Sequence, residues 1–193
     1  MRIDDIYETC KSDIVFETLK THCSQFFVES QGLPLYKNLS PQYEDFQKVK
    51  VRKKNSSNEF TETFNEAFEK QHPDLRQRAI FANGESSFQP IHDEIHDPFY
   101  IFPINGFRFM YSKEVQNSGS EYKQVFETLF GQFGEEKGNE VLADLLRFTY
   151  TSKNLNEGIE TGSEIIMFGI PYYYAIRVSS IASYDQLITR ISK

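Results

Sequence analysis

A single carboxylate, Glu164, stands at the entrance of the most apolar stretch of the chain, two residues after Gly162. Residues 162–178 are typical of a strand, a tight turn at Gly169 and Pro171, and a second strand. An acid in this position is either a solvated strand-edge residue or a group placed for catalysis. Glu160 is the nearest candidate for a second acid, but its position at the end of a predicted helix indicates a solvated side chain.

The segment His92–Asp97 is the obvious candidate for a metal site. Its two histidines stand at positions i and i+4, which can share one ion on a helix. Pro90 and Pro98 bracket the segment, so a helix there would span only about one or two turns. The acids also fall one position away from the H-E-x-x-H pattern. We therefore expect a solvated acidic loop and no metal.

Composition narrows the classes of function. The chain has 193 residues, a net charge of -7, 18 Phe and 11 Tyr, which is enough for one domain with a sizeable core. The acidic balance disfavours nucleic acid as a partner. A local basic run at residues 48–54 indicates an exposed edge strand or, as an alternative, a phosphate-binding patch. Walker A, GxGxxG and G-x-S-x-G motifs are absent, which removes most nucleotide-hydrolysing enzymes and hydrolases from the leading set.

The cysteines and the apolar runs bear on location. Cys10 and Cys23 are thirteen residues apart, which suits neither a zinc knuckle nor a disulfide framework and fits a reducing cytosol. The longest apolar run, residues 165–176, is too short and too broken to span a bilayer. No signal peptide is visible at the start of the sequence. We expect a protein of the cytoplasm without a membrane partner.

Periodicity and breakers predict the elements. Helices are expected at residues 4–29, 59–71, 120–131, 135–149, 152–161 and 184–191. Strands are expected at residues 33–36, 46–53, 78–82, 99–102, 107–111 and on both sides of Gly169. Asn105–Gly106 predicts a hairpin between two of these strands. The helices occur in blocks, which predicts an α+β fold with a mainly antiparallel, split sheet. The expected domain is residues 1–193, with a helical segment at 1–30, a core at 31–183 and a C-terminal helix or tail at 184–193.

Three short segments resemble the ADP-ribosyltransferase family. Residues 35–38, Leu-Tyr-Lys-Asn, are similar to the Leu-Tyr-Arg-Gly step on that family's first strand. Residues 162–167 and 174–178 are similar to its glutamate strand and closing strand, and residues 78–87 occupy the place of its central Ser-Thr-Ser strand. The stretch 30–178 also resembles uncharacterised small proteins of tailed bacteriophages.

The first resemblance implies NAD as the substrate and transfer of ADP-ribose to a host macromolecule. Glu164 would stabilise the oxocarbenium-like transition state at the ribose. Lys37 would hold the pyrophosphate in place of arginine. The remaining cofactor-binding candidates would order the site or stack on nicotinamide: Tyr36, Arg78, Asn83, Ser86 and Tyr100.

The chain departs from the family pattern at several positions. Asn38 replaces glycine, and Ala82-Asn83-Gly84 replaces the serine-rich triplet. Gly162 stands where many arginine-modifying members carry a second acid, which disfavours arginine as the acceptor. Plain structural roles remain open as well: a strand-edge acid for Glu164, a solvated lysine for Lys37 and a salt bridge for Arg78.

Two other functions stay open. The first is a non-catalytic phage protein, either a virion component or a binder of a host factor, that uses a tyrosine-rich surface at residues 172–174. The second is a small nuclease or nucleotide-binding module that uses the basic run. On these hypotheses the protein acts in the host cytoplasm or in the virion, with a host or phage protein as its partner.

Overall fold

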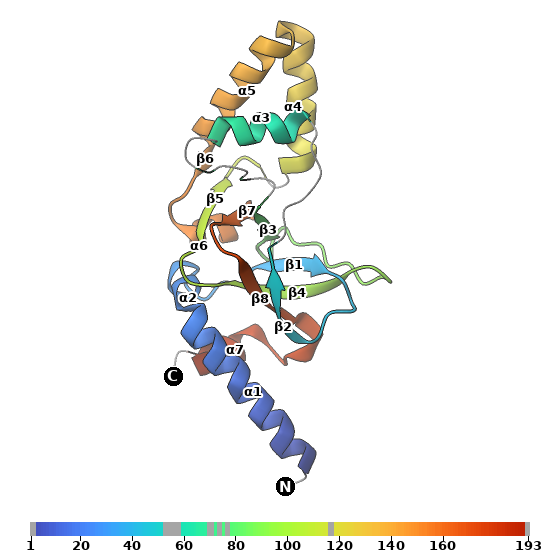
Figure 1. Ribbon diagram of the computed structural model, residues 1–193, viewed down its shortest axis with the longest axis vertical. Coiled ribbons are helices and arrows are strands. Elements are labelled where there is room, and N and C mark those ends of the chain that lie inside the picture. Colours follow the sequence, from blue (N-terminus) through green and yellow to red (C-terminus); the bar gives the residue numbers. More distant parts are fainter. Residues whose placement is uncertain are drawn as a thin grey trace.

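The structure is a computed structural model that describes residues 3–51, 59–68, 72, 75, 78–115 and 118–191 (Figure 1). The helices are α1 (Ile3–His22), α2 (Ser24–Glu29), α3 (Glu59–Phe68), α4 (Ser118–Phe133), α5 (Glu135–Thr149), α6 (Leu155–Glu160) and α7 (Tyr184–Ile191). The strands are β1 (Tyr36–Leu39), β2 (Phe46–Lys50), β3 (Ile80–Asn83), β4 (Asp97–Pro103), β5 (Arg108–Ser112), β6 (Tyr150–Thr151), β7 (Glu164–Phe168) and β8 (Tyr172–Arg177).

All eight strands belong to one antiparallel sheet in the order β2-β8-β4-β1-β3-β7-β5-β6. The prediction of an α+β fold with an antiparallel sheet is therefore confirmed. The sheet has two halves, β2-β8-β4-β1 and β3-β7-β5-β6. Among the neighbouring strands, β1 and β3 meet through a single residue pair, Tyr36 opposite Asn83.

A long, bent ribbon of two antiparallel strands also connects the halves. In the first half Phe99 lies opposite Arg177, and in the second half Arg108 lies opposite Phe168. The residue numbers of opposite partners add up to the same value in both halves, so the register is kept across the bend. The chain thus runs as one interrupted strand from β4 into β5, beside another from β7 into β8.

The predicted hairpin at Asn105–Gly106 is wrong, because β4 pairs with β1 and β8 while β5 pairs with β6 and β7. The turn is used to hold two helices instead. The Asn105 side chain accepts a hydrogen bond from the backbone N–H of Gln25 at 3.0 Å and donates one to the Thr21 carbonyl at 3.2 Å. These groups lie at the start of α2 and the end of α1, where helices leave backbone groups without internal partners. The strands on either side of Gly169 likewise exist as predicted but do not pair with each other.

The bend folds the two halves over one core. The side chains on one face of the ribbon lie in a single buried cluster, with members from both halves: Phe99, Ile101, Ala175, Ile165 and Met167. This continuity explains how a short strand such as β3 can be stable, since burial of apolar surface dominates the free energy of folding. The order β3-β7-β5 then places the ends of three strands next to one another.

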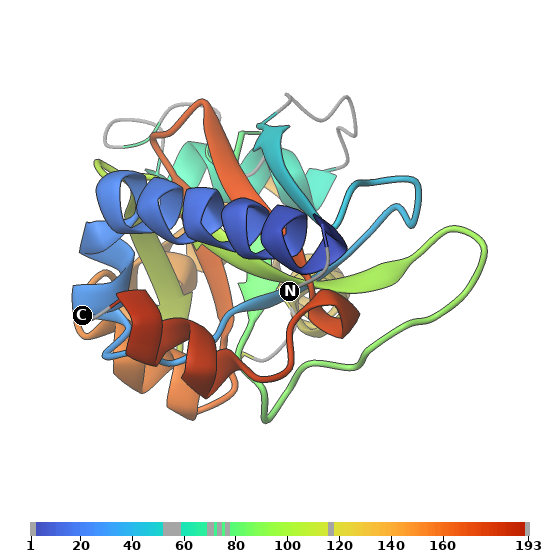
Figure 2. The same ribbon diagram turned by 90° about the horizontal axis from the view of Figure 1, so that it is seen from below.

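Two groups of helices cover the opposite face of the sheet. Helices α1, α2 and α7 cover the first half, where Phe26 of α2 lies 6.0 Å from Phe102 between ring centroids. Tyr184 of α7 lies 4.9 Å from Tyr100 in the same way. Helices α3, α4 and α5 cover the second half through a separate cluster that includes Ile166 and Leu142. Figures 1 and 2 show α1 and α7 side by side at one end of the molecule, with the α4–α5 hairpin at the other.

Several predicted boundaries shift. The helix predicted at 4–29 is interrupted at Cys23, whose φ of -123° and ψ of 18° are not helical. Strand β1 begins at Tyr36 and continues to Leu39, and the short strand β6 was not predicted. The break between α4 and α5 at Gly134 and the C-terminal helix are confirmed. The predicted loop at 55–58, the helix stop at Pro73 and part of the basic run (Arg52, Lys53 and Lys54) lie outside the described residues.

Candidate functional site

The strand register brings four of the sequence-predicted residues into one line across the sheet. Glu164 lies opposite Asn83, Asn83 opposite Tyr36, and Tyr36 opposite Tyr100. Directly opposite residues of antiparallel strands share a face and have Cβ atoms about 4.5–5.5 Å apart. We call these four residues the cross-strand row. The row crosses the junction of the two halves, between the two groups of helices.

At the acidic end of the row, the loop that contains Ser86 and Ser87 packs closely against Gly162. Glu164 is half-buried and follows Gly162, which has a φ of +74°. A Cβ atom at Gly162 would stand 2.9 Å from the Ser86 hydroxyl and 3.2 Å from the Ser87 Cβ. Asn83 reaches towards the same loop, with its side-chain nitrogen 3.5 Å from the Ser87 hydroxyl. Ser86 therefore lies beside the residues that lead into Glu164.

The other end of the row is aromatic and tightly packed. Tyr36 stacks on Phe88 at 4.9 Å with 15° between the ring planes, and its ring centroid lies 5.0 Å from that of Tyr100. Tyr184 of α7 packs against Tyr100 at 4.9 Å. The rings of Tyr36 and Tyr100 are thus already in contact with protein rings. Stacking of nicotinamide on either ring requires Phe88 or Tyr184 to move.

Burial also fixes the protonation state of these phenols. It raises the pKa of Tyr36 above the ordinary tyrosine value, with further contributions from the Tyr100 phenol and the Glu85 carboxylate. Burial is also the main cause of the raised pKa of Tyr100, although the hydrogen bond from Tyr36 acts in the opposite direction. Burial raises the pKa of Tyr184 in the same way. The three phenols are neutral at physiological pH and serve as hydrogen-bonding groups, not as bases.

Lys37 does not belong to the row, because consecutive residues of a strand point to opposite faces. Its ammonium donates a hydrogen bond to the Phe81 carbonyl at 2.8 Å. Phe81 lies on β3 beyond the single pair that joins β1 to β3. The lysine therefore bridges the two strands where their ladder ends, a position in which it stabilises the junction.

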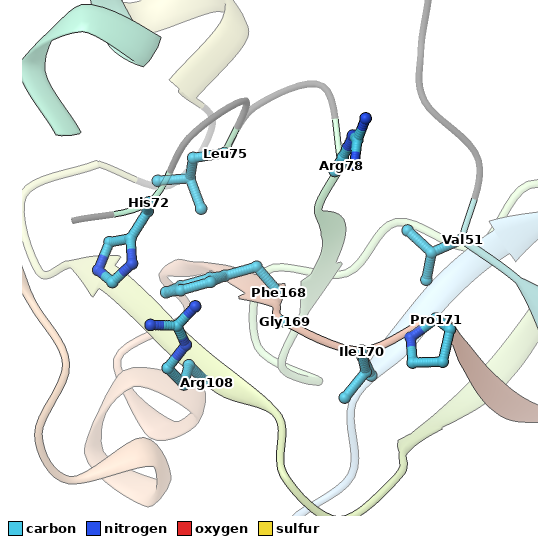
Figure 3. A pocket seen from close by; sticks show the side chains of 9 residues that line it. All are labelled: Val51, His72, Leu75, Arg78, Arg108, Phe168, Gly169, Ile170 and Pro171. Atoms are coloured by element: carbon cyan, nitrogen blue, oxygen red, sulfur yellow. The ribbon is translucent and has the colours of Figure 1, made fainter. Parts of the chain in front are cut away.

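Arg78 lies away from the row, at the opposite end of β3 from Asn83. It lines a pocket of about 410 Å³ together with Arg108, His72, Phe168 and residues of the Gly169–Pro171 turn (Figure 3). Arg108 is not among the site residues predicted from the sequence. Its position in this pocket depends on the register of the bent ribbon, and a lone arginine at the start of a predicted strand gives no local signal of this kind.

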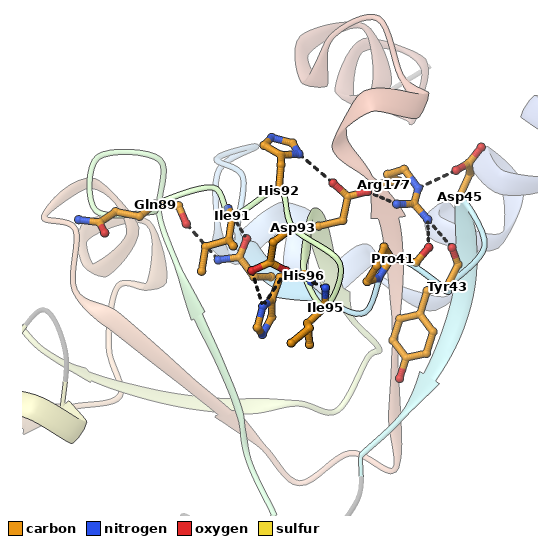
Figure 4. A network of polar contacts seen from close by, with 12 residues as sticks. Pro41, Tyr43, Asp45, Gln89, Ile91, His92, Asp93, Ile95, His96 and Arg177 are labelled. Atoms are coloured by element: carbon orange, nitrogen blue, oxygen red, sulfur yellow. Dashed lines mark hydrogen bonds and ion pairs between the residues drawn. The ribbon is translucent and has the colours of Figure 1, made fainter.

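The segment His92–Asp97 is a polar loop that leads into β4 (Figure 4). The Asp93 carboxylate accepts hydrogen bonds from the backbone N–H groups of Ile95 at 2.7 Å and His96 at 2.6 Å. These bonds are the leading cause of a pKa of Asp93 below its usual range. His92 pairs with Asp97 at 3.0 Å. Within the described residues, no group of three or more His, Cys, Asp or Glu side chains is placed to hold a metal ion.

Asp97 also belongs to a network around Arg177, whose side chain is only 15% exposed. The guanidinium pairs with Asp97 and with Asp45, the latter at 2.8 Å. The guanidinium also donates hydrogen bonds to the carbonyl groups of Pro41 and Tyr43, which lie in the loop between β1 and β2. The guanidinium carbon of Arg177 lies 4.9 Å from the centroid of the Phe99 ring. Every one of these partners is structural, so Arg177 ties the loop after β1 to strands β4 and β8.

The proposed tyrosine surface is wrong in its placement. Tyr173 and Tyr174 are 5% and 9% exposed, and only Tyr172 is half-exposed, beneath the Lys48 ammonium at 3.6 Å. The large exposed apolar side chains lie elsewhere, with Phe148 of α5 exposed to 90%. None of the described helices combines the length and apolar character needed to cross a membrane.

Comparison with protein-family models, with curated protein sequences and with solved structures yields no match to this chain.

Proposed function

We propose that the cross-strand row is an NAD-binding site and that the protein transfers ADP-ribose from NAD to a host macromolecule. One observation carries this proposal. Glu164, Asn83 and Tyr36 belong to three separate stretches of sequence, and the strand register aligns them on one face of the sheet. The Ser86 hydroxyl lies close to Gly162, the glycine that precedes Glu164 by two residues.

The chemistry assigned to Glu164 follows from charge. Cleavage of the bond between nicotinamide and ribose develops positive charge on the ribose, and nicotinamide leaves with the bonding electron pair. A carboxylate within contact distance stabilises that charge, as carboxylates do at glycosidic centres. A nucleophile of the acceptor then forms the new bond to the ribose carbon. In this proposal the Asn83 amide and the Ser86 hydroxyl orient the ribose by hydrogen bonds.

The geometry also restricts the proposal. The Lys37 ammonium is committed to the Phe81 carbonyl, and Arg78 lies at the far end of β3, so neither is placed to hold the pyrophosphate beside Glu164. The aromatic end of the row must open at Phe88 or Tyr184 to admit a nicotinamide ring. In this proposal the position of the nicotinamide ring is therefore filled by protein rings until NAD binds.

The test is release of nicotinamide from NAD, measured by chromatography, for the native chain, Glu164→Gln and Glu160→Gln. Glu160 is a matched control because it is an exposed acid at the end of the neighbouring helix. Loss of one electrostatic stabiliser of a transition state lowers the rate by about 10²–10³-fold, so Glu164→Gln should lose nearly all turnover while Glu160→Gln keeps it. Full turnover by Glu164→Gln, or no turnover by the native chain at millimolar NAD, would refute the proposal.

A second candidate is a non-catalytic phage protein, a virion component or a binder of a host factor. The observation that favours it is the exposure of Phe148 at 90% and Phe133 at 49%, both on the α4–α5 hairpin. Single exposed apolar residues are ordinary, but a nearly fully exposed Phe on a protruding hairpin suits a contact surface. A Phe148→Ser protein that keeps the native thermal stability but no longer supports phage growth would assign the hairpin to a partner.

A further inference from the structure

We propose that Phe88 is a lid on the aromatic end of the cross-strand row. Its ring fills the place of a flat, positively charged heteroaromatic ring and swings away when such a ring binds. The identity of that ring as the nicotinamide of NAD rests on the function proposed above, whereas the lid itself does not. Of the two protein rings packed there, those of Phe88 and Tyr184, only the first has to move.

The Phe88 ring lies on Tyr36 in the way that a bound ligand ring would lie. The two ring centroids are 4.9 Å apart and the ring planes differ by 15°. This is the parallel arrangement of stacked aromatic rings, in which the rings share a large flat contact. The Tyr100 ring, the other aromatic neighbour of Tyr36, is inclined to it by 42°. Phe88 therefore occupies the parallel stacking face of Tyr36.

Phe88 is held less firmly than Tyr184. It lies outside the helices and strands and is only partly buried. Among the described residues, Tyr36 is the one whose ring stacks on it. Tyr184 is 8% exposed, packs against Tyr100 at 4.9 Å and donates a hydrogen bond to the Leu33 carbonyl at 3.4 Å. Movement of Tyr184 would expose more apolar surface and break a hydrogen bond, so Phe88 is the ring that yields.

The backbone on both sides of Phe88 is anchored, so the lid is a side chain and not a whole loop. Gly84 packs so closely on α6 that a Cβ atom there would stand 2.2 Å from the Ile159 carbonyl oxygen. The Phe88 N–H donates to the Gly84 carbonyl at 3.0 Å. On the other side, the Asn38 amide donates to the Gln89 carbonyl at 3.0 Å. The ring can thus leave the stack by rotation about its side-chain bonds while the turn stays in place.

Two carboxylates favour a positive charge at this place. Glu85 of the turn and Asp185 in the first turn of α7 are both exposed. Burial is the largest cause of the raised pKa of Tyr36 and of Tyr100, and the charges of both carboxylates add to it. Negative charge that disfavours a phenolate favours a cation at the same place. The faces of the neutral phenol rings also attract cations. The covered site should therefore prefer a pyridinium ring to a neutral one.

The experiment is binding of 1-methylnicotinamide, which carries the positive ring alone, measured by ligand-observed NMR titration. The proteins are the native chain, Phe88→Ala and, as the control, Phe16→Ala. Phe16 is also a partly buried phenylalanine on the same core cluster, but its ring lies on α1 at 3.9 Å from the guanidinium carbon of Arg190. A ring that must be displaced lowers the apparent affinity, so Phe88→Ala should bind about three- to tenfold more tightly than the native chain. The control should bind as the native chain does.

Neutral nicotinamide distinguishes a lid from a cavity that the substitution creates. A cavity left by alanine accepts a neutral ring at least as well as a charged one. The lid site should prefer 1-methylnicotinamide to nicotinamide by about two- to fivefold, and Glu85→Gln should reduce that preference. Equal or reversed preference in Phe88→Ala would assign the gain to a cavity and overturn the proposal. In the native chain, a nuclear Overhauser contact between the Phe88 and Tyr36 rings that persists at saturation would also overturn it.

The lid and the transferase function fail in different ways. Tighter binding of 1-methylnicotinamide by Phe88→Ala, with no release of nicotinamide from NAD by any of the proteins, would refute the transferase and leave the lid. Turnover of NAD by the native chain, with equal affinity or no binding of 1-methylnicotinamide in Phe88→Ala, would refute the lid alone. If Phe88→Ala does not fold, Phe88→Leu keeps an apolar side chain, loses the stack and gives the same comparison.

Discussion

The two halves of the sheet are covered in different ways. The first half is covered by α1, α2 and α7, which come from the two ends of the chain and meet its strands through aromatic rings such as Phe26, Phe102 and Tyr184. The second half is covered by α3, α4 and α5, of which α4 and α5 are consecutive. The first cover therefore depends on contacts between distant parts of the sequence, whereas most of the second is local.

This difference indicates where each half of the sheet can tolerate substitutions. The candidate site and the pocket lie at the edges of the covers: the cross-strand row runs between the two groups of helices, and the pocket lined by Arg108 lies at the end of β7. The centre of the first half is closed by aromatic packing and by the Arg177 network. Substitutions that weaken the first half should thus unfold the protein, while those at the pocket should have less effect on stability.

The largest effect should come from truncating Phe102. This side chain is fully buried and packs against Phe26, Phe27 and Tyr184. Phe102→Ala should lower the free energy of unfolding by about 3–5 kcal/mol, because it removes apolar burial and leaves a cavity. Phe168 in the second half borders a pocket. The matched substitution Phe168→Ala should therefore lower the free energy of unfolding by only about 1.5–3 kcal/mol. Urea unfolding of both variants tests the comparison, and equal losses would contradict it.

An intermediate effect is expected at Arg177. Arg177→Gln removes a mostly buried guanidinium and leaves Asp97 without its main partner, which should lower the free energy of unfolding by about 2–3 kcal/mol. The exposed pair of Arg190 and Asp13 belongs to the same half and provides the control, since Arg190→Gln should cost less than about 1 kcal/mol. Thermal unfolding followed by circular dichroism measures both. If Arg190→Gln lowered the free energy of unfolding as much as Arg177→Gln, the exposure of an ion pair would not determine its contribution to stability.

The smallest loss of stability is expected at Asn105. Its side chain follows β4 and bonds backbone groups at the end of α1 and the start of α2. Asn105→Ala should cost about 1 kcal/mol, a value typical of a lost helix cap. Asn105→Asp keeps the acceptor for the Gln25 N–H and loses the donor to the Thr21 carbonyl. It should therefore fall between Ala and the native residue. If the Asp variant were less stable than the Ala variant, the capping role would be wrong.

The sequence predicted the elements better than their partners. Apolar periodicity located every long helix, and the alternation of apolar residues located β4, β5, β7 and β8. The pairing failed because Asn105–Gly106 and Gly169–Pro171 are ordinary turn signals that the fold uses to bend a ribbon. Local chemistry specifies that the chain changes direction, but the partner across the sheet is set by long-range burial.

The same distinction explains what could be found of the sites. Glu164 could be nominated from its position before an apolar strand. Asn83 and Tyr36 could be nominated only because their segments resemble motifs of the ADP-ribosyltransferase family. Arg78 and Arg108 become neighbours of one pocket only because β3 and β5 both flank β7. No spacing along the chain contains that information.

The bent ribbon has a consequence for how the chain reaches its native state. Each half of the sheet takes strands from both sides of the bend, and none of the described strands pairs with the strand that immediately follows it, apart from β5 and β6, which are separated by α4 and α5. Loop closure over such separations must precede most of the stabilising contacts, which slows folding. The strands of the first half span residues 36–177, so nearly the whole chain must leave the ribosome before that half of the sheet can form.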